Sequence, residues 1–319
     1  MYLFQLKPFI RAIRLLCFCY FAPRLKKLSS IPVGVRHMLL STFFFALMNV
    51  CIKKVSHLPE MEIVFFRCMV AMLICFGYIF KHKLDWKGSN RLLLFLRGFF
   101  GTIAVYTFFV TLHSMPLGTA VTIQYLSPVF TTIIAIFLLK EGVKPMQWLF
   151  FLLSFGGVVF IKGFDQRFSI GILLKGIISA MSSGFAYNFV RSLKEREAPK
   201  VVVLHFQIIG TIVGGIGCLF SWQNPSATDW LYLVAIGVLT QLGQTYLTKA
   251  LQAEKAANVS ILNYLGVIYA LIFGWLIFDE HYPLQTFMGI ILVIGGVLLN
   301  YIYTSRKAPV EEKLSGVEE

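Results

Sequence analysis

The sequence predicts an all-α polytopic membrane protein. We expect ten transmembrane helices, arranged as two inverted five-helix repeats, with both termini cytoplasmic. Of the 319 residues, 57% are hydrophobic and only 14% are charged, whereas a soluble domain has roughly 25% charged residues. Apolar stretches follow one another with short connections, and the second half of the chain repeats the first. A soluble surface cannot be built from so few charges.

The apolar stretches define the predicted spans, because a helix of about 20 residues crosses the hydrocarbon core of a bilayer. We expect helices over residues 34–54, 60–80, 92–113, 117–139, 146–162, 169–190, 200–221, 229–249, 256–278 and 283–303. Residues 1–33 are predicted to be a basic cytoplasmic or interfacial segment, and residues 304–319 a polar cytoplasmic tail. The spaced Arg11 and Arg14 suit an amphipathic helix on the inner surface. A true start at Met38 is the alternative, although it would cut into the first span.

The basic residues predict the orientation. With both ends cytoplasmic, the inner segments hold 22 of the 29 Lys and Arg, and the outer loops hold four. Cytoplasmic loops of membrane proteins carry this excess of positive charge. The basic residues form short clusters between apolar runs, so the net charge of +14 does not indicate a nucleic-acid partner. The six cysteines form no CxxC pair, and we interpret them as small apolar residues of the helix interior. We expect no cofactor and no metal.

The internal repeat appears when the sequence is shifted by 139 residues without a gap. Each copy contains five predicted helices, an odd number, so the second copy enters the membrane from the opposite side. Inverted repeats are typical of secondary transporters that alternate access about a central site. The aligned pairs include Asn49 and Asn188, Gly98 and Gly237, Tyr125 and Tyr264, Glu141 and Glu280, and Gly157 and Gly296.

Two stretches of the repeat resemble a known family. LGTAVTIQYLSPVFTTIIAIFLLKE (117–141) and AANVSILNYLGVIYALIFGWLIFDE (256–280) are similar to the paired EamA signatures of the drug/metabolite transporter superfamily, and FGGVVFI and IGGVLLN follow them. The resemblance covers about residues 36–303. It implies a first repeat over residues 34–163, a second over residues 169–303, a break in the middle of the signature helix, a central cavity and solute transport. Gly266 and Val267 replace Ser127 and Pro128 in the second copy.

Polar side chains within the predicted helices supply the candidate substrate contacts, because such groups usually face the bundle interior or a wet cavity. The alternative is that each only bonds a neighbouring helix, for about 1 kcal/mol. Pro128 would free a backbone carbonyl near Gln124. Asn49 and Asn188 are predicted to be polar pivots in the first helix of each repeat. The other candidate contacts are Gln124, Tyr125, Tyr106, Gln241, Gln244, Asn263 and Tyr264.

Charged residues inside the spans are few. Arg67 and Arg97 would recognise a carboxylate or phosphate if they point inward, or they would snorkel to the headgroups if they do not. No Asp or Glu lies at the centre of a predicted span, which argues against coupling through a buried carboxylate. His205 remains as a titratable candidate. Glu280, at a helix end, is expected to anchor a loop.

These observations predict a secondary transporter of the cell inner membrane, not an enzyme, that moves a small organic metabolite by alternating access. An anionic or carboxylate-bearing solute is expected if Arg67 or Arg97 points inward. A lipid flippase or a channel-like protein is the alternative, and a membrane-embedded transferase is a further one, for which the sequence offers no DxxD pattern or close His–acid pair within a span. The expected partners are the solute and the lipid bilayer. The sequence does not decide whether the chain forms a homodimer.

Overall fold

A computed structural model describes residues 33–83, 85–138, 140, 142–164, 167–193, 196–253 and 261–315. All regular secondary structure in these ranges is helical, which confirms the predicted fold class. The predicted N-terminal segment over residues 1–33 lies outside the described residues except for Val33. The helices are α2 (Val33–Lys54), α3 (Glu60–Lys81), α4 (Arg91–Ser114), α5 (Leu117–Gln124), α6 (Ser127–Leu138), α7 (Pro145–Phe164), α8 (Ile170–Leu193), α9 (Pro199–Cys218), α10 (Ala227–Ala253), η2 (Ile261–Tyr264), α12 (Leu265–Phe278) and α13 (Leu284–Ser315).

The long helices are membrane-spanning in length and composition. Eight segments of the described chain qualify: α2, α3, α4, α5 with α6, α7, α8, α9 and the first part of α13. The shorter apolar α12 and the 27-residue α10 pack in the same bundle. The chain is therefore a multi-pass membrane protein, while the count of ten spans stays a prediction. Residues 304–315, predicted to be a polar tail, continue α13 as helix.

The signature helix of the first repeat is broken where the resemblance predicts. α5 ends at Gln124 and α6 begins at Ser127. Pro128 has no backbone N–H to donate to the carbonyl of Gln124, four residues earlier. In the second repeat, the 3₁₀ turn η2 joins α12 at the aligned position, although Gly266 and Val267 replace Ser127 and Pro128. The helix irregularity is thus present in both copies and does not require the proline.

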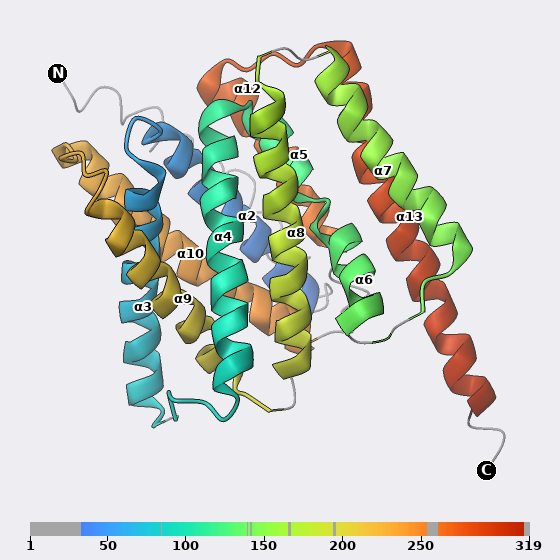
Figure 1. The fold of residues 1–319 in the computed structure, drawn as a ribbon, viewed down its shortest axis with the longest axis horizontal. Helices are drawn as coiled ribbons and strands as arrows, with labels where there is room; N and C mark the ends of the chain where they lie inside the picture. Colours follow the sequence, from blue (N-terminus) through green and yellow to red (C-terminus); the bar gives the residue numbers. More distant parts are fainter. Residues whose placement is uncertain are drawn as a thin grey trace, which may run out of the picture.

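The last helices of the two repeats, α7 and α13, pack side by side at one edge of the bundle (Figure 1). They run antiparallel, because Gln147 donates to Asn300 over 3.0 Å while Ser154, further along α7, donates to the carbonyl of Val293 over 3.4 Å. Ser154 and Val293 are equivalent in the repeat, being 139 residues apart. Equivalent residues thus meet at the repeat interface, and the repeats are inverted.

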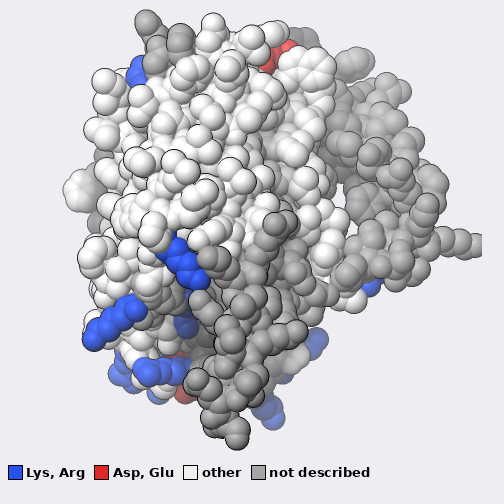
Figure 2. All heavy atoms as spheres, turned by 90° about the vertical axis from the view of Figure 1, so that its right-hand side faces the viewer, with Lys and Arg blue, Asp and Glu red and all other residues white. Residues whose placement is uncertain are grey.

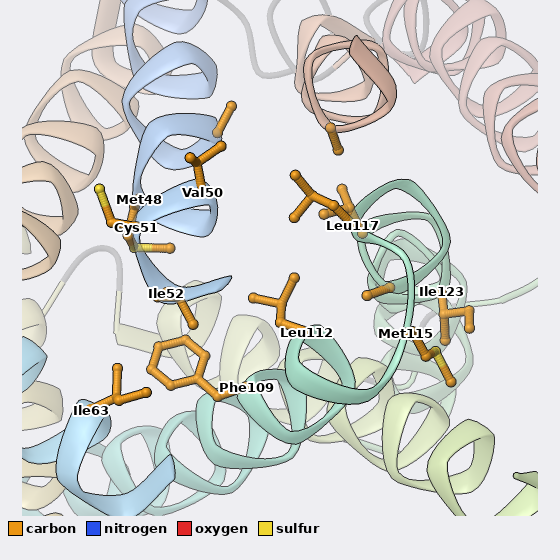
Figure 3. Packing of buried hydrophobic residues seen from close by; sticks show 14 of the residues in the cluster. Met48, Val50, Cys51, Ile52, Ile63, Phe109, Leu112, Met115, Leu117 and Ile123 are labelled. Atoms are coloured by element: carbon orange, nitrogen blue, oxygen red, sulfur yellow. The ribbon is translucent and has the colours of Figure 1, made fainter. Parts of the chain in front are cut away.

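Most of the buried apolar side chains form one cluster that extends across α2, α3, α4 and α5. Figure 3 shows Ile63 of α3 and Ile52 of α2 on either side of Phe109 of α4, with Leu112 one turn further along α4. Leu117 and Ile123 add α5 to the same core. This packing holds the end of the bundle at which α2 meets α3 and α4 meets α5.

The basic side chains gather toward the opposite end. On the face drawn in Figure 2, the Lys and Arg lie mostly toward the lower end, where Figure 1 places the α3–α4 and α8–α9 connections and the end of α13. An excess of positive charge is typical of cytoplasmic loops. The location of both termini in the cytoplasm stays a prediction that this distribution favours.

The Gly-Gly pairs offer a test of the α7–α13 interface. A Cβ on Gly157 would lie 2.8 Å from the backbone oxygen of Gly289, whereas a Cβ on Gly156 would meet nothing within 4 Å. We expect Gly157→Ala to lower the free energy of unfolding by about 1–3 kcal/mol through overpacking. Gly156→Ala, the matched control, should be neutral or slightly stabilising. Thermal unfolding in detergent measures both. Equal melting temperatures for the two variants would contradict this packing.

Candidate functional site

Two arginines lie inside the bundle and share an aromatic ring. Arg67 of α3 is 3% exposed and Arg97 of α4 is 8% exposed. The guanidinium carbon of Arg97 lies 4.5 Å from the ring centroid of Phe206 on α9, and that of Arg67 lies 5.5 Å from the same centroid. Cation–π attraction of this kind contributes up to about 2 kcal/mol in a desolvated site. The arginines therefore point inward and do not snorkel to the headgroups.

The positive charge of this pair has no acidic partner among the described residues. The ion pairs among the described residues are Lys53–Glu280, His57–Asp229 and His113–Glu60, so neither arginine has a carboxylate partner there. The Nε of each arginine is buried and makes no hydrogen bond within the described chain. A buried charge without a counter-ion is costly. The site is therefore electrostatically complementary to an anion.

A second group of candidates meets at the break of the signature helices. The rings of Tyr125 and Tyr264, which are equivalent in the repeat, lie 5.2 Å apart between centroids. The contact between these equivalent residues places the irregular points of the two signature helices next to each other.

Gln124 and Asn188 bond neighbouring helices. The Gln124 amide donates to Ser183 over 2.9 Å and accepts from Ser179 over 2.6 Å, both on α8. Asn188 donates to the carbonyl of Thr131 on α6 over 2.9 Å. These contacts fix the broken helix against α8, which is the structural alternative considered for such residues. The Oδ1 of Asn188 is buried without a partner among the described residues, so one acceptor remains there.

The remaining candidates are spread over the bundle. Asn49 on α2 and Gln241 on α10 are buried, and the side-chain oxygen of each lacks a partner within the described residues. Tyr106 on α4 packs against the main apolar core. Gln244 lies on α10, next to Thr245, which accepts a hydrogen bond from Lys200 over 3.0 Å. The side chain of Asn263 lies outside the described part of the chain.

Two residues of α9 were not among the sequence candidates: Phe206 and Gln207. Gln207 is fully buried on α9, and neither its amide nitrogen nor its oxygen has a partner in the described chain. A polar side chain within a predicted span was the available signal for Gln207. Phe206 had no such signal, because its role depends on the two arginines that reach it from α3 and α4.

A polar network closes the end of the bundle opposite the basic loops. The carboxylate of Glu280 pairs with Lys53 of α2 and accepts from the N–H of Leu117 at the start of α5 over 2.7 Å. Lys53 also donates to the carbonyl of Met115 over 2.8 Å. Tyr282 donates to Glu280 over 2.6 Å, and burial and this hydrogen bond raise the pKa of Tyr282 above its usual value. Glu280 therefore joins α2, α5 and the α12–α13 connection.

The architecture and the site together define a class of protein: an inverted-repeat membrane bundle with buried polar groups at the break of its signature helices. A comparison with family models gives the family. The EamA-like transporter family matches residues 33–163 and again residues 169–302. The chain belongs to this family, so it is a membrane transporter rather than an enzyme.

Individual relatives are solute transporters from distant organisms. The pseudopaline exporter CntI of Pseudomonas aeruginosa is 28% identical over 265 residues, covering 82% of this chain and 93% of that protein. Human solute carrier family 35 member G1 is 30% identical over 309 residues, covering 89% and 84%. The S-adenosylmethionine uptake transporter of Rickettsia felis is 26% identical over 258 residues, covering 79% and 86%.

The fold is shared with a protein of known structure. A solved crystal structure superimposes with a TM-score of 0.60, covering 86% of this chain and 98% of that one. The two sequences are only 14% identical, so the likeness concerns the fold. The helical arrangement is therefore one that a natural protein adopts.

The Glu280 network yields a stability prediction. Lys53→Met leaves the largely buried Glu280 carboxylate without its ion-pair partner, and we expect a loss of about 2–3 kcal/mol in the free energy of unfolding. In a double-mutant cycle with Glu280→Gln, the coupling energy should be at least about 1 kcal/mol. The neighbouring Lys54 also lies over the Phe278 ring, at 5.0 Å, but is exposed. Lys54→Met is therefore the control and should change stability little. Additive effects in the cycle would show that the pair is not coupled.

Proposed function

We propose that this chain is a secondary transporter of the inner membrane that moves a small organic metabolite bearing a carboxylate or a phosphate. The observation that carries the proposal is the pair of buried arginines, Arg67 and Arg97, without a carboxylate partner among the described residues. A solute anion would provide the counter-charge. Guanidinium groups suit this task because their planar N–H donors match carboxylate and phosphate oxygens.

The tyrosine pair supplies the rest of the proposed site. Tyr125 and Tyr264 lie in ring contact where the signature helices of both repeats are irregular. In this proposal the phenols contact the body of the solute, while the arginines hold its anionic group. Supporting contacts from Gln241, Asn49 and Asn188 rest on their buried, unpartnered side-chain oxygens. Tyr106, Gln124, Gln244 and Asn263 remain proposed contacts that await substitution.

Alternating access is the proposed mechanism. The inverted contact of α7 with α13 supports it, since inverted repeats can exchange conformations about a shared axis. The Glu280 network would then act as the closed outer gate, and opening would require Lys53 to leave Glu280 and Met115. The proposal leaves the direction of transport open, because one relative is named an exporter and another an uptake transporter. The bacterial relatives favour the inner membrane.

A ligand screen by thermal shift tests the solute class. Purified protein in detergent is mixed with carboxylates, phosphate esters, amino acids, and neutral or cationic compounds. A ligand at 100 times its Kd stabilises the folded state by about 2.7 kcal/mol. We expect the shifts to come from anionic compounds, and Arg67→Gln or Arg97→Gln to weaken their binding at least about tenfold, which is about 1.4 kcal/mol.

The control is Lys81→Gln, which removes an exposed positive charge from the same helix as Arg67. This variant should bind the anionic ligands as the unmodified protein does. Uptake of the best ligand into proteoliposomes should fall in both arginine variants and not in the control. Shifts that come only from neutral or cationic compounds, or that survive both arginine substitutions, would overturn the anion-binding role.

A further inference from the structure

A pocket outside the proposed transport site opens at the basic end of the bundle. It has a volume of about 380 Å³ and is lined by Trp86 and Lys87 of the α3–α4 connection, Arg91 at the start of α4, and His205 of α9. His205 donates from Nδ1 to the carbonyl of Val201 over 3.0 Å, so its Nε2 can donate to a ligand only in the protonated ring. The lining of this pocket contains two cations, an imidazole and an indole, and no carboxylate.

The connection that carries Trp86 and Lys87 is held in place from α8–α9. Glu197 accepts hydrogen bonds from the N–H and hydroxyl of Ser89 and from the N–H of Asn90, the last two over 2.7 and 2.8 Å. Burial acts to raise the pKa of Glu197, but these hydrogen bonds hold the pKa below its usual value. Glu197 is therefore ionised, and its carboxylate fixes the backbone of the connection at Ser89 and Asn90.

Gly88 and Asn90 complete this local structure. Gly88 has φ +69°, and a Cβ there would lie 3.2 Å from a carboxylate oxygen of Glu197 and closer still to Leu94. Asn90 caps α4 by accepting from the N–H of Leu93 over 3.2 Å. The positive end of a 24-residue helix thus lies beside Arg91. The hydrogen bonds to Glu197 and the Asn90 cap thus fix the backbone between Lys87 and Arg91, the two basic residues of the pocket.

An apolar track runs from the pocket along the outside of α4. Leu92, Phe95 and Phe99 follow at i, i+3 and i+7 and are 67%, 52% and 43% exposed. The rings of Phe95 and Phe99 are stacked, 6.1 Å apart. Phe95 lies four residues after Arg91, so the track begins on the face that carries this cation. A ligand with an anionic head and hydrocarbon chains would match the pocket and the track together.

We propose that this pocket binds the phosphodiester headgroup of an anionic phospholipid, with its acyl chains along Leu92, Phe95 and Phe99. Lys87 and Arg91 contact the phosphate oxygens, and His205 of α9, protonated beside the phosphate, donates to it from Nε2. In this proposal Trp86, which is 42% exposed, takes a place at the membrane interface, where indole rings are favoured. Basic pockets at the cytoplasmic surface attract anionic lipid headgroups. Binding would tie the α3–α4 connection to α9, and it does not depend on the identity of the transported solute.

The test uses the full-length protein in a neutral detergent, with added phosphatidylglycerol or phosphatidylcholine. We expect phosphatidylglycerol to raise the melting temperature by about 3–5 °C more than phosphatidylcholine does. The double variant Lys87→Gln/Arg91→Gln should lose this difference. The control Lys81→Gln/Lys83→Gln removes the same charge from exposed positions that do not line the pocket, and it should keep the difference.

Two further arms identify the ligand and the location. Inorganic phosphate at millimolar concentration should give no shift, and a shift equal to that of the lipid would overturn the phospholipid proposal in favour of a soluble phosphate. Phosphatidylglycerol with brominated chains should quench the Trp86 emission, measured as the difference between the unmodified protein and Trp86→Phe. An absent quenching difference, or an equal loss of the lipid effect in both double variants, would show that the pocket is not the site.

Discussion

The contact between residues that occupy the same position in the two repeats is the constraint on which the rest of the bundle depends. Ser154 meets Val293 where α7 crosses α13, and Tyr125 meets Tyr264 where the signature helices are irregular. The antiparallel course of α7 and α13 shows that the second repeat is inverted relative to the first, and the tyrosine contact is compatible with this symmetry. A bilayer demands that backbone groups be satisfied within the protein, so the irregular helix segments can only lie at such a protected interface. The inverted packing therefore decides where polar backbone can occur.

Charge inside this framework is distributed unevenly. Glu280 is surrounded by its donors Lys53, Tyr282 and the N–H of Leu117, and it stabilises one end of the bundle. Arg67 and Arg97 both lie over the ring of Phe206, and neither has an acidic partner in the described chain. Both arrangements are buried, but the first contains both charges of an ion pair, whereas the second contains positive charge alone within the described residues. In the proposed function, an anionic solute supplies the missing charge.

Part of the site could be predicted from single residues. Arg67 and Arg97 were identified because charged groups are rare in a span, and Tyr125 and Tyr264 were identified because the repeat aligns them. Gln124 was identified on the same basis, and its two hydrogen bonds to α8 give it a structural role as well. Phe206 could not be identified, since a phenylalanine in an apolar helix carries no signal until its neighbours are known.

The sequence by itself determined the class of the fold, because low charge, periodic apolar stretches and a repeat in one register leave few architectures in a membrane. The family resemblance and the predicted orientation were likewise obtained from the linear sequence alone. Only the tertiary structure decided whether Arg67 and Arg97 faced lipid or protein, because that choice depends on the rotation of α3 and α4 against α9. It also decided that Glu197 holds the α3–α4 connection. Glu197 is 108 residues from Ser89 and 107 residues from Asn90 in the chain. Such contacts follow from helix packing, which the linear pattern of residues does not specify.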